Sequence, residues 1–324
     1  MTSSGFRYSF GPVPSRRLGK SLGINNIPAK ICTYACVYCQ VGQTTEMLAD
    51  RRPFYPPEDI FRDVQRRLAK AREASERVDY LTVVPDGEPT LDVNLGKAIA
   101  LLKTLDAPVG VITNSSLLWR EDVREELGRA DWVSLKIDAV QETIWRKINR
   151  PHPAIGLSQI LDGIRLFAKA FTGKLVTETM LIHGLNDQDD CMKAVADFLH
   201  TLQPSRAYLS VPTRPPAVAH IRAPDAAPLS RAYQVLAASG APVEYLIGDE
   251  GNSFACISDI GKDILSITAV HPMREEAIRM MLSRAGASWD VVERLVAQGA
   301  LVKTSYDGQA FYRKNSGQCG PSPR

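Results

Sequence analysis

The chain has 324 residues, of which 44% are hydrophobic and 23% charged, and its net charge is +3. These values are typical of a soluble globular protein with a sizeable core, and the charge is far below that of nucleic-acid binders. The first 19 residues contain two prolines and no continuous apolar run, and no later segment approaches about 18 uninterrupted apolar residues. We therefore expect a cytoplasmic protein with neither a signal peptide nor a membrane partner.

The chain opens with an expected strand at residues 21–27 and then alternates strand-like and helix-like runs. Short β-branched or apolar runs bounded by turn residues predict strands at 79–84, 108–113, 132–137, 174–182 and 206–211. Amphipathic stretches between them predict helices at 56–77, 93–105, 120–128, 155–170 and 189–202. About six βα units in sequence indicate a parallel sheet with helical crossovers, in either an open barrel or a doubly wound sheet. In both arrangements, functional residues lie at the carboxyl ends of the strands.

The last third of the chain has a different pattern. Proline-rich residues 211–228 predict a linker that ends a main domain over 1–228. Residues 229–260 are expected to form a connecting segment with a helix at 229–238 and a strand at 243–247. Three helical runs and two alternating strands then predict a small α+β module of winged-helix type at 261–315. Its third helix carries more acid than base, which favours protein docking or domain capping over DNA binding. Residues 316–324 predict a disordered tail.

Three of the six cysteines fall within eight positions, in the run ICTYACVYC. Six cysteines without a secretory signal argue against a disulfide framework, and thiolates select zinc or iron–sulfur clusters. A structural zinc would need a fourth ligand, and none of the five histidines is adjacent to Cys32, Cys36 or Cys39. A cubane iron–sulfur cluster on three cysteines would instead leave one iron open to a second ligand. The spacing by itself leaves both possibilities open.

The pattern Cys-x3-Cys-x2-Cys, with Tyr38 before the last cysteine, resembles the signature loop of the radical S-adenosylmethionine (SAM) superfamily. The resemblance implies a partial (β/α)6 barrel and a [4Fe–4S] cluster on Cys32, Cys36 and Cys39, with SAM chelating the open iron. It further implies an electron donor of flavodoxin or ferredoxin type. Reductive cleavage of SAM would then release a 5′-deoxyadenosyl radical that abstracts hydrogen from a substrate.

Further motifs follow the expected strands in the order found in that superfamily. The run DGEPT resembles the loop that binds the amino group of SAM, although Asp86 stands where the superfamily has glycine. The positions that the resemblance assigns to SAM are Gly87, Glu88 and Pro89 in this loop, Asn114 and Ser115 in ITNSS, Ser134, Lys136 and Asp138 in VSLKIDA, and Ile182, Gly184 and Asn186 in LIHGLND.

The similarity covers about residues 10–216 and points to a branch of bacterial and archaeal radical SAM proteins near the wyosine-tRNA synthases. A wyosine-type reaction implies additional cysteines before the signature loop, and no cysteine precedes Cys32. It also implies an imine-forming lysine, whereas Lys136 is more simply interpreted as bonding polar groups at a barrel mouth. The sequence thus predicts a radical SAM enzyme with an unidentified substrate, which is RNA, a peptide or a small molecule. Wyosine-type tRNA modification, and a cluster- or zinc-dependent regulator acting through the winged helix, stay open as alternatives.

Three arginines outside these motifs have two possible roles. Arg16 and Arg17 in PSRRLG, and Arg214 in TRPP, could hold an anionic substrate or the carboxylate of SAM, because guanidinium binds carboxylates bidentately. Alternatively, they pin proline-bounded loops to the barrel. The sequence does not choose between these roles.

Overall fold

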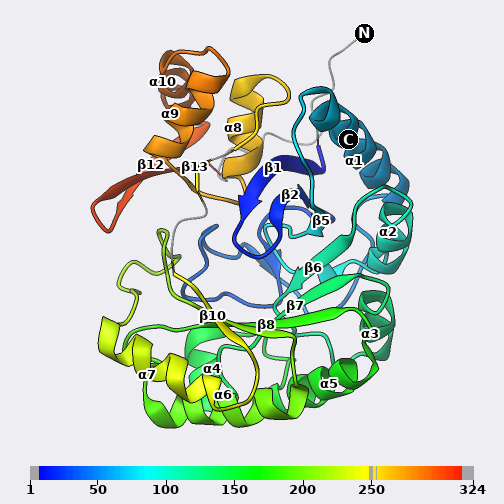
Figure 1. Ribbon diagram of the computed structural model, residues 1–324, viewed down its shortest axis with the longest axis vertical. Coiled ribbons are helices and arrows are strands. Elements are labelled where there is room, and N and C mark those ends of the chain that lie inside the picture. Colours follow the sequence, from blue (N-terminus) through cyan, green and yellow to red (C-terminus); the bar gives the residue numbers. More distant parts are fainter. Residues whose placement is uncertain (1–6, 248–250, 253, 316–324) are drawn as a thin grey trace.

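The computed structural model describes residues 7–247, 251–252 and 254–315, and its main body is an open half-barrel (Figure 1). One sheet has the strand order β1-β2-β5-β6-β7-β8-β9-β10, and all neighbours except β1 and β2 run parallel. The bounds are β1 (Ser9–Ser15), β2 (Gly19–Ile24), β5 (Tyr80–Val83), β6 (Val109–Thr113), β7 (Trp132–Lys136), β8 (Lys174–Met180), β9 (Arg206–Ser210) and β10 (Val243–Leu246). The predicted α/β partial barrel is therefore confirmed.

Helices cover the outer face of this sheet (Figure 1). They are α1 (Pro57–Glu73), α2 (Leu95–Leu102), α3 (Glu121–Leu127), α4 (Glu142–Asn149), α5 (Leu157–Ala170), α6 (Asp189–Leu202) and α7 (Ala226–Ala237). In α1, the apolar residues Ile60, Val64 and Leu68 recur at helical spacing and are buried, while Pro57 occupies the first turn. Outward-facing strand residues and these helix faces form the largest core of the molecule.

The sheet has more strands than the sequence pattern predicts. The region 229–260, expected to be a connecting segment, supplies most of α7 and all of β10, and β10 pairs in parallel with β9. The boundary expected at residue 228 lies inside α7. At the other edge, β1 was not predicted, because Pro12 and Pro14 weaken a strand pattern. Such residues are tolerated in β1 because it is an edge strand.

Alternate strand residues fill the bottom of the half-barrel. Leu18, in the turn between β1 and β2, packs with inward-facing residues of four parallel strands: Trp132, Val176, Tyr208 and Leu246. Since side chains alternate between the two faces of a strand, this floor also fixes which neighbouring positions face the interior. The space above the floor is therefore lined by the next inward positions of β7, β8 and β9.

The C-terminal part forms a second, smaller core. It contains α8 (Ile260–Thr268), β11 (Met273–Arg274), α9 (Glu275–Arg284), α10 (Asp290–Ala297), β12 (Leu301–Tyr306) and β13 (Gln309–Lys314), with the strand order β11-β13-β12. Phe10 and Val13 of β1 belong to this core, so the module is packed against the edge of the half-barrel. The assignment of 261–315 to the winged-helix class stays a prediction. The expected tail at 316–324 lies outside the described residues.

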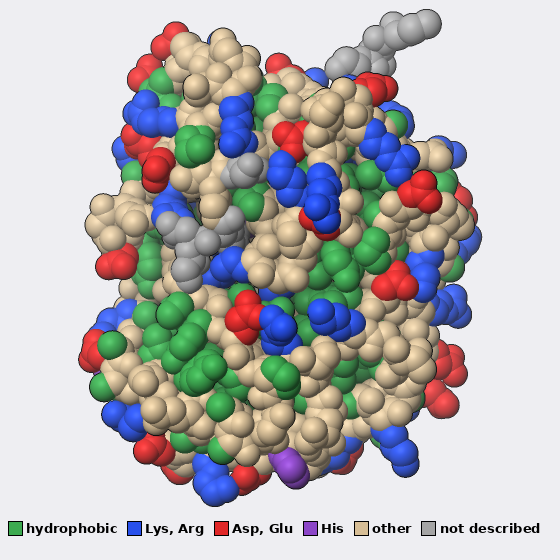
Figure 2. Space-filling model, viewed as in Figure 1, with side chains coloured by type: hydrophobic (Ala, Val, Ile, Leu, Met, Phe, Trp, Pro, Cys, Tyr) green, Lys and Arg blue, Asp and Glu red, His purple; other side chains and the backbone are tan. Residues whose placement is uncertain are grey.

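Charged side chains of both signs are interspersed over the face drawn in Figure 2, and the described residues there form no single basic patch. In the described part of the chain, no helix is both long enough and apolar enough to span a membrane.

Candidate cofactor site

The three clustered cysteines lie on the long loop between β2 and α1, which is tied to two other segments. Within it, β3 (Ile31–Cys32) pairs with β4 (Glu46–Met47). The Lys30 amide donates to the carbonyl of Asp86 at 2.7 Å, and the Glu88 amide donates to that of Ile31 at 3.1 Å. On the other side, the Val37 amide donates to the carbonyl of Ile148 at the end of α4, at 2.9 Å. Cys32, Cys36 and Cys39 are all free thiols.

Gly87 permits the close contact between the cysteine loop and the loop after β5. Its φ of +157° is a conformation that residues with a Cβ rarely adopt. A Cβ added there would overlap the carbonyl oxygen of Ile31. Below it, the Lys30 Nζ lies 2.8 Å from Asp86 Oδ2, and both side chains are buried. The departure of Asp86 from the superfamily pattern thus supplies an ion pair that joins the two loops.

Two side-chain amides point at cysteine sulfurs. Asn114 Nδ2 lies 3.5 Å from Cys32 Sγ, and Asn149 Nδ2 lies 3.4 Å from Cys36 Sγ. Burial raises the pKa of all three thiols, that of Cys36 to about 12, while hydrogen bonds such as the one from Asn149 act in the opposite direction. Sequence reasoning missed Asn149, because it lies outside the runs that the resemblance assigns to SAM.

The donor set is of a kind that an iron–sulfur cluster can use. Among the described residues, no three His, Cys, Asp or Glu side chains converge closely enough to hold one ion. Three free thiols on one loop, two of them beside amide N–H groups, are the ligand type and surroundings that iron–sulfur clusters use. Of the other described cysteines, Cys191 lies on α6 and contacts Gln141 and Gln188.

Glu88 is buried and joins the ends of two neighbouring strands. Its Oε1 accepts hydrogen bonds from the Thr90 amide at 3.0 Å, the Thr90 hydroxyl at 2.6 Å and the Thr113 hydroxyl at 2.6 Å. Its Oε2 accepts one from the Asn114 amide at 2.7 Å. Burial raises the pKa of Glu88, and these hydrogen bonds oppose the shift. Ser115 follows with a φ of +70°, and its buried hydroxyl has no partner among the described residues.

Tyr38 and Asp138 connect the cysteine loop to the loop after β7. The Tyr38 hydroxyl donates to Asp138 Oδ2, which also accepts from Asn149 Nδ2 at 2.8 Å, and Asp138 Oδ1 accepts from the Met180 amide at 2.9 Å. Asn186 is fully buried, and its Nδ2 donates to the carbonyls of Asp138 and Met180 at 2.9 Å each. The predicted positions after β7 and β8 are thus brought together with the cysteine loop.

The remaining predicted positions differ in their surroundings. The Ile182 amide donates to Asn186 Oδ1 at 2.8 Å, and Gly184 is exposed with a φ of +70°. Ser134 is buried in β7. The Lys136 Nζ lies 2.7 Å from Glu178 Oε1 and 5.0 Å from the centre of the Tyr38 ring.

The structure separates the roles of the three arginines. Arg16 donates to the carbonyl of Leu246 in β10, Arg17 pairs with Glu178 inside the half-barrel, and Arg214 donates to Gln40 of the cysteine loop. Arg214 also lies 3.1 Å from the Nε2 of His271, in the C-terminal module.

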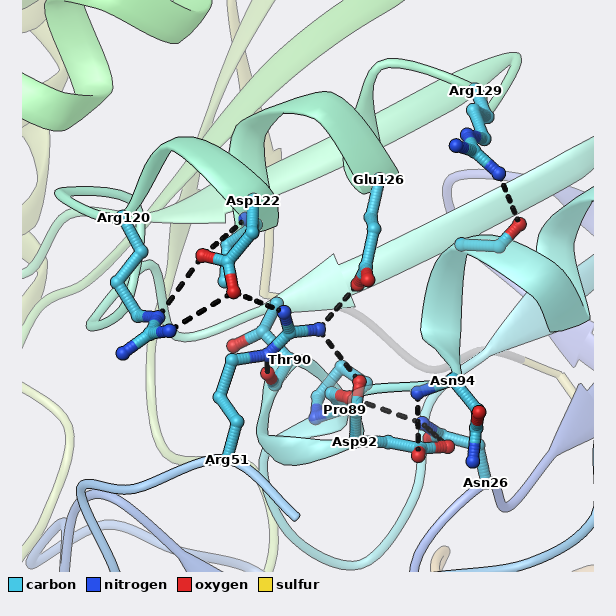
Figure 3. Close-up of polar contacts among 12 residues, drawn as sticks. Asn26, Arg51, Pro89, Thr90, Asp92, Asn94, Arg120, Asp122, Glu126 and Arg129 are labelled. Carbon is cyan, nitrogen blue, oxygen red and sulfur yellow. Dashed lines mark hydrogen bonds and ion pairs between the residues drawn. The ribbon is translucent and has the colours of Figure 1, made fainter. Parts of the chain in front are cut away.

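The buried side chain of Arg51 connects the loop after β5 to helix α3 (Figure 3). Arg51 donates to the carbonyls of Thr90 and Asp92 at 2.8 and 2.7 Å, and it pairs with Asp122 and Glu126 of α3. The loop ends in a short 3-10 helix (Pro89–Leu91). Asn26 donates to the carbonyl of Pro89 at 3.0 Å. This network holds the backbone at residues 89–92, next to Asp86 and Glu88, which contact the cysteine loop.

The raised pKa of Asp92, a member of this network, leads us to expect that the stability of the protein depends on pH. Burial raises its pKa from 3.8 to about 6, against the opposing effects of the Asn94 amide, Asn26 and Arg51. Because the folded state holds this proton to a higher pH than the unfolded state, its contribution to stability is full below about pH 4 and is lost as the pH rises to 6. Relative to Asp92→Asn, the wild type should lose up to about 3 kcal/mol of unfolding free energy over that interval, measured by urea titration at each pH. Equal pH slopes in the two proteins would contradict this expectation.

Replacing Asn149 with alanine is expected to weaken retention of an iron–sulfur cluster. The change removes the amide beside Cys36 and one of the donors to Asp138, and loss of an outer partner of a metal ligand costs about 10- to 100-fold in metal affinity. The rate of iron transfer to a chelator under anaerobic conditions measures the effect. Asn94→Ala is the matched control, because the Asn94 side chain makes no hydrogen bond among the described residues. Equal rates in both variants would show that Asn149 does not support the cluster.

The half-barrel, with three free thiols beside the carboxyl ends of its strands, places the chain in the partial-barrel class of α/β proteins. The chain belongs to the radical SAM superfamily, because residues 26–198 match the family model described as "Radical SAM superfamily". It is also 47% identical over 309 residues to a UPF0026 protein of Methanocaldococcus jannaschii, across 95% of this chain and 96% of that protein. Members of the superfamily typically bind a [4Fe–4S] cluster and SAM. Membership in the superfamily implies that the chain is an enzyme.

Two solved structures are similar to this chain at low sequence identity. The crystal structure of Streptococcus suis SuiB bound to S-adenosylmethionine has a TM-score of 0.51 at 14% identity, covering 69% of this chain and 49% of that one. TYW1 with a lysine-pyruvate adduct has a TM-score of 0.44 at 12% identity, covering 92% and 82%. The SuiB likeness confirms the radical SAM type of partial barrel.

Proposed function

We propose that this chain holds a [4Fe–4S] cluster on Cys32, Cys36 and Cys39 and cleaves SAM reductively to begin a reaction on a substrate. The observation that carries the proposal is the arrangement of the three free thiols. They lie on one loop, with the Asn114 and Asn149 amides at two of the sulfurs and the Gly87 turn against the loop backbone. When bound, the cluster supplies the electron that cleaves SAM. A ferredoxin- or flavodoxin-type protein would provide that electron.

The residues that would hold SAM lie at the ends of four neighbouring strands. Beside the Gly87 turn, Glu88 Oε2 has one hydrogen bond in the structure and can accept another from an ammonium group. Asn114 and Ser115 follow the next strand, and the buried Ser115 hydroxyl still needs a partner. The other proposed contacts lie between the cysteines, after β5, within or after β7, or after β8: Tyr38, Pro89, Ser134, Lys136, Asp138, Ile182 and Gly184.

Asn186 would act on the site by positioning other groups. Its amide and carbonyl groups bond the backbone of Asp138, Met180 and Ile182, so the side chain is already satisfied within the protein. It fixes the course of the chain after β8, beside which the adenine of SAM would lie. Thr90 and Thr113 have the same positioning role for Glu88.

The direct test measures 5′-deoxyadenosine. Protein reconstituted anaerobically with iron and sulfide, then mixed with SAM and dithionite, should form 5′-deoxyadenosine in proportion to its cluster content. Omitting dithionite or chelating the iron should stop product formation. A preparation that binds about one zinc, contains no sulfide and forms no 5′-deoxyadenosine would overturn the proposal.

A further inference from the structure

Three charged side chains from distant parts of the sequence meet inside the half-barrel. Arg17, in the turn between β1 and β2, donates to Glu178 Oε2, while the Lys136 Nζ lies 2.7 Å from Glu178 Oε1. The Ser210 hydroxyl of β9 donates to the same Oε1 at 2.9 Å. One carboxylate in β8 therefore holds two cations.

The alternation of side chains places this cluster directly above the apolar floor. Trp132 and Val176 belong to the floor, and Lys136 and Glu178 lie four and two positions further along the same strands, on the same face. On the upper side, the Lys136 ammonium lies over the Tyr38 ring, 5.0 Å from its centre. These three charged side chains thus lie between the barrel floor and the cysteine loop. A substrate would bind in this space in order to contact SAM.

Glu178 and Lys136 each favour the charged form of the other. Burial by itself would raise the pKa of Glu178, but the charges of Lys136 and Arg17 outweigh it and hold that pKa well below its usual range. Burial would lower the pKa of Lys136, but Glu178 and then Asp138 reverse the direction and raise it. Asp138 is the second acid acting on Lys136, and both of its oxygens are bonded by Tyr38, Asn149 and the Met180 amide.

The two cations have more hydrogen-bond donors than Glu178 can use. A lysine has three N–H donors and an arginine five. Within the described part of the chain, each of these side chains makes one hydrogen bond, and both of those go to Glu178. The side chains of Arg17 and Lys136 are 18% and 16% exposed, so solvent reaches them although they line the interior. Donors left over in a partly desolvated position favour an anionic partner.

We propose that Arg17 and Lys136, held in place by Glu178, bind an anionic group of the substrate, a carboxylate or a phosphate, between the barrel floor and SAM. Lys136 gives one of its three donors to Glu178, so the other two can serve both this group and SAM. The inference rests on the proposed function, because it assumes that SAM binds between these charged side chains and the cysteine loop. Arg16 is excluded from this role, since its guanidinium bonds the carbonyl of Leu246 in β10.

Equilibrium dialysis tests the proposal on the full chain, anaerobically reconstituted and saturated with SAM so that acetate cannot occupy the position of the SAM carboxylate. The probes are inorganic phosphate and acetate, and the one that binds more tightly identifies the chemistry of the group. We expect saturable binding of one equivalent. Arg17→Gln should weaken it about 10- to 100-fold, the value of one hydrogen-bonded charge pair. Arg17→Lys keeps the charge and should weaken it less.

Arg16→Gln is the matched control, because it removes the same charge one position away, and it should leave anion affinity unchanged. The inference is overturned if the wild type binds neither probe saturably, or if Arg16→Gln and folded Arg17→Gln weaken binding equally. Should Arg17→Gln fail to fold, Arg17→Lys decides: affinity equal to the wild type would overturn the inference, and reduced affinity in a folded protein would support it. The 5′-deoxyadenosine assay on the same wild-type preparation separates the two proposals. If no 5′-deoxyadenosine forms but the anion binds, the proposed function is wrong. If 5′-deoxyadenosine forms but neither anion binds, the proposed anion site is wrong.

Discussion

Cys36→Ala is expected to reduce the rate of 5′-deoxyadenosine formation more than about 100-fold, because loss of an outer partner alone costs up to that factor and Cys36 would be a direct ligand. Two remaining thiols cannot retain a cubane with a single open corner, so iron and acid-labile sulfide should fall with the activity. Both contents are measured on the same anaerobic preparation. The fold should persist, since Cys36 is half-buried and its loop is held through the backbone of Val37 and Lys30.

Cys256→Ser is the matched control for this loss. Cys256 is also half-buried, and its thiol contacts the carbonyl of Ser258 near the C-terminal module. Its replacement should leave both sulfide content and 5′-deoxyadenosine formation close to the wild type. A Cys36→Ala protein that kept its sulfide and its activity would contradict the assignment of the three ligands.

Gly87→Ala is expected to destabilise the protein by about 2–4 kcal/mol and to separate the cysteine loop from the loop after β5. The new Cβ would overlap the carbonyl oxygen of Ile31, and alanine rarely adopts the φ of +157° found here. Moving that carbonyl away breaks its hydrogen bond from the Glu88 amide. Chemical denaturation measures the loss of stability, and equilibrium binding of SAM measures the loss of the site.

Gly156→Ala provides the comparison for this substitution. Gly156 precedes α5 with a φ of −110°, and a Cβ there meets nothing within 4 Å. The same chemical change should therefore cost little stability and leave SAM binding intact. Equal stabilities of the two variants would show that the contact between Gly87 and Ile31 is not required.

The two substitutions examine different parts of one unit. Cys36 tests whether the thiols are ligands, whereas Gly87 tests whether the site depends on two loops held at backbone distance. The side chains of Lys30 and Asp86 also join the two loops, through a buried ion pair with 2.8 Å between Nζ and Oδ2. A protein that lost SAM binding in Gly87→Ala but kept its cluster would separate the two functions of this unit.

Local patterns in the sequence predicted the elements that carry the site. The strands at 79–84, 108–113 and 132–137 correspond to β5, β6 and β7, because short apolar runs between turn residues have few alternative structures. By contrast, β1 was missed because prolines interrupt its pattern. The strand after α7 was noticed but not placed in the sheet, since pairing with β9 is not encoded in its four residues.

The role of each predicted site residue was harder to foresee than its position. Asn186 was expected to contact SAM. In the structure, its side-chain amide donates hydrogen bonds to the backbone carbonyls of Asp138 and Met180. Asn149 carried no motif signal of its own, and it lies beside Cys36 across 113 residues of sequence. Sequence reasoning gave Arg16 and Arg17 equal standing, although they point to different partners, Leu246 and Glu178.

The sequence by itself determined the three-cysteine spacing and the order of the strand-end motifs, and it predicted thiolate ligands, because each of these depends on a few consecutive residues. Only the tertiary structure decided that Arg17 reaches Glu178 across 161 residues and that Asn149 lies beside Cys36. Such contacts depend on strand register and on the curl of the sheet, which arise from packing of the whole half-barrel and not from any local run of residues.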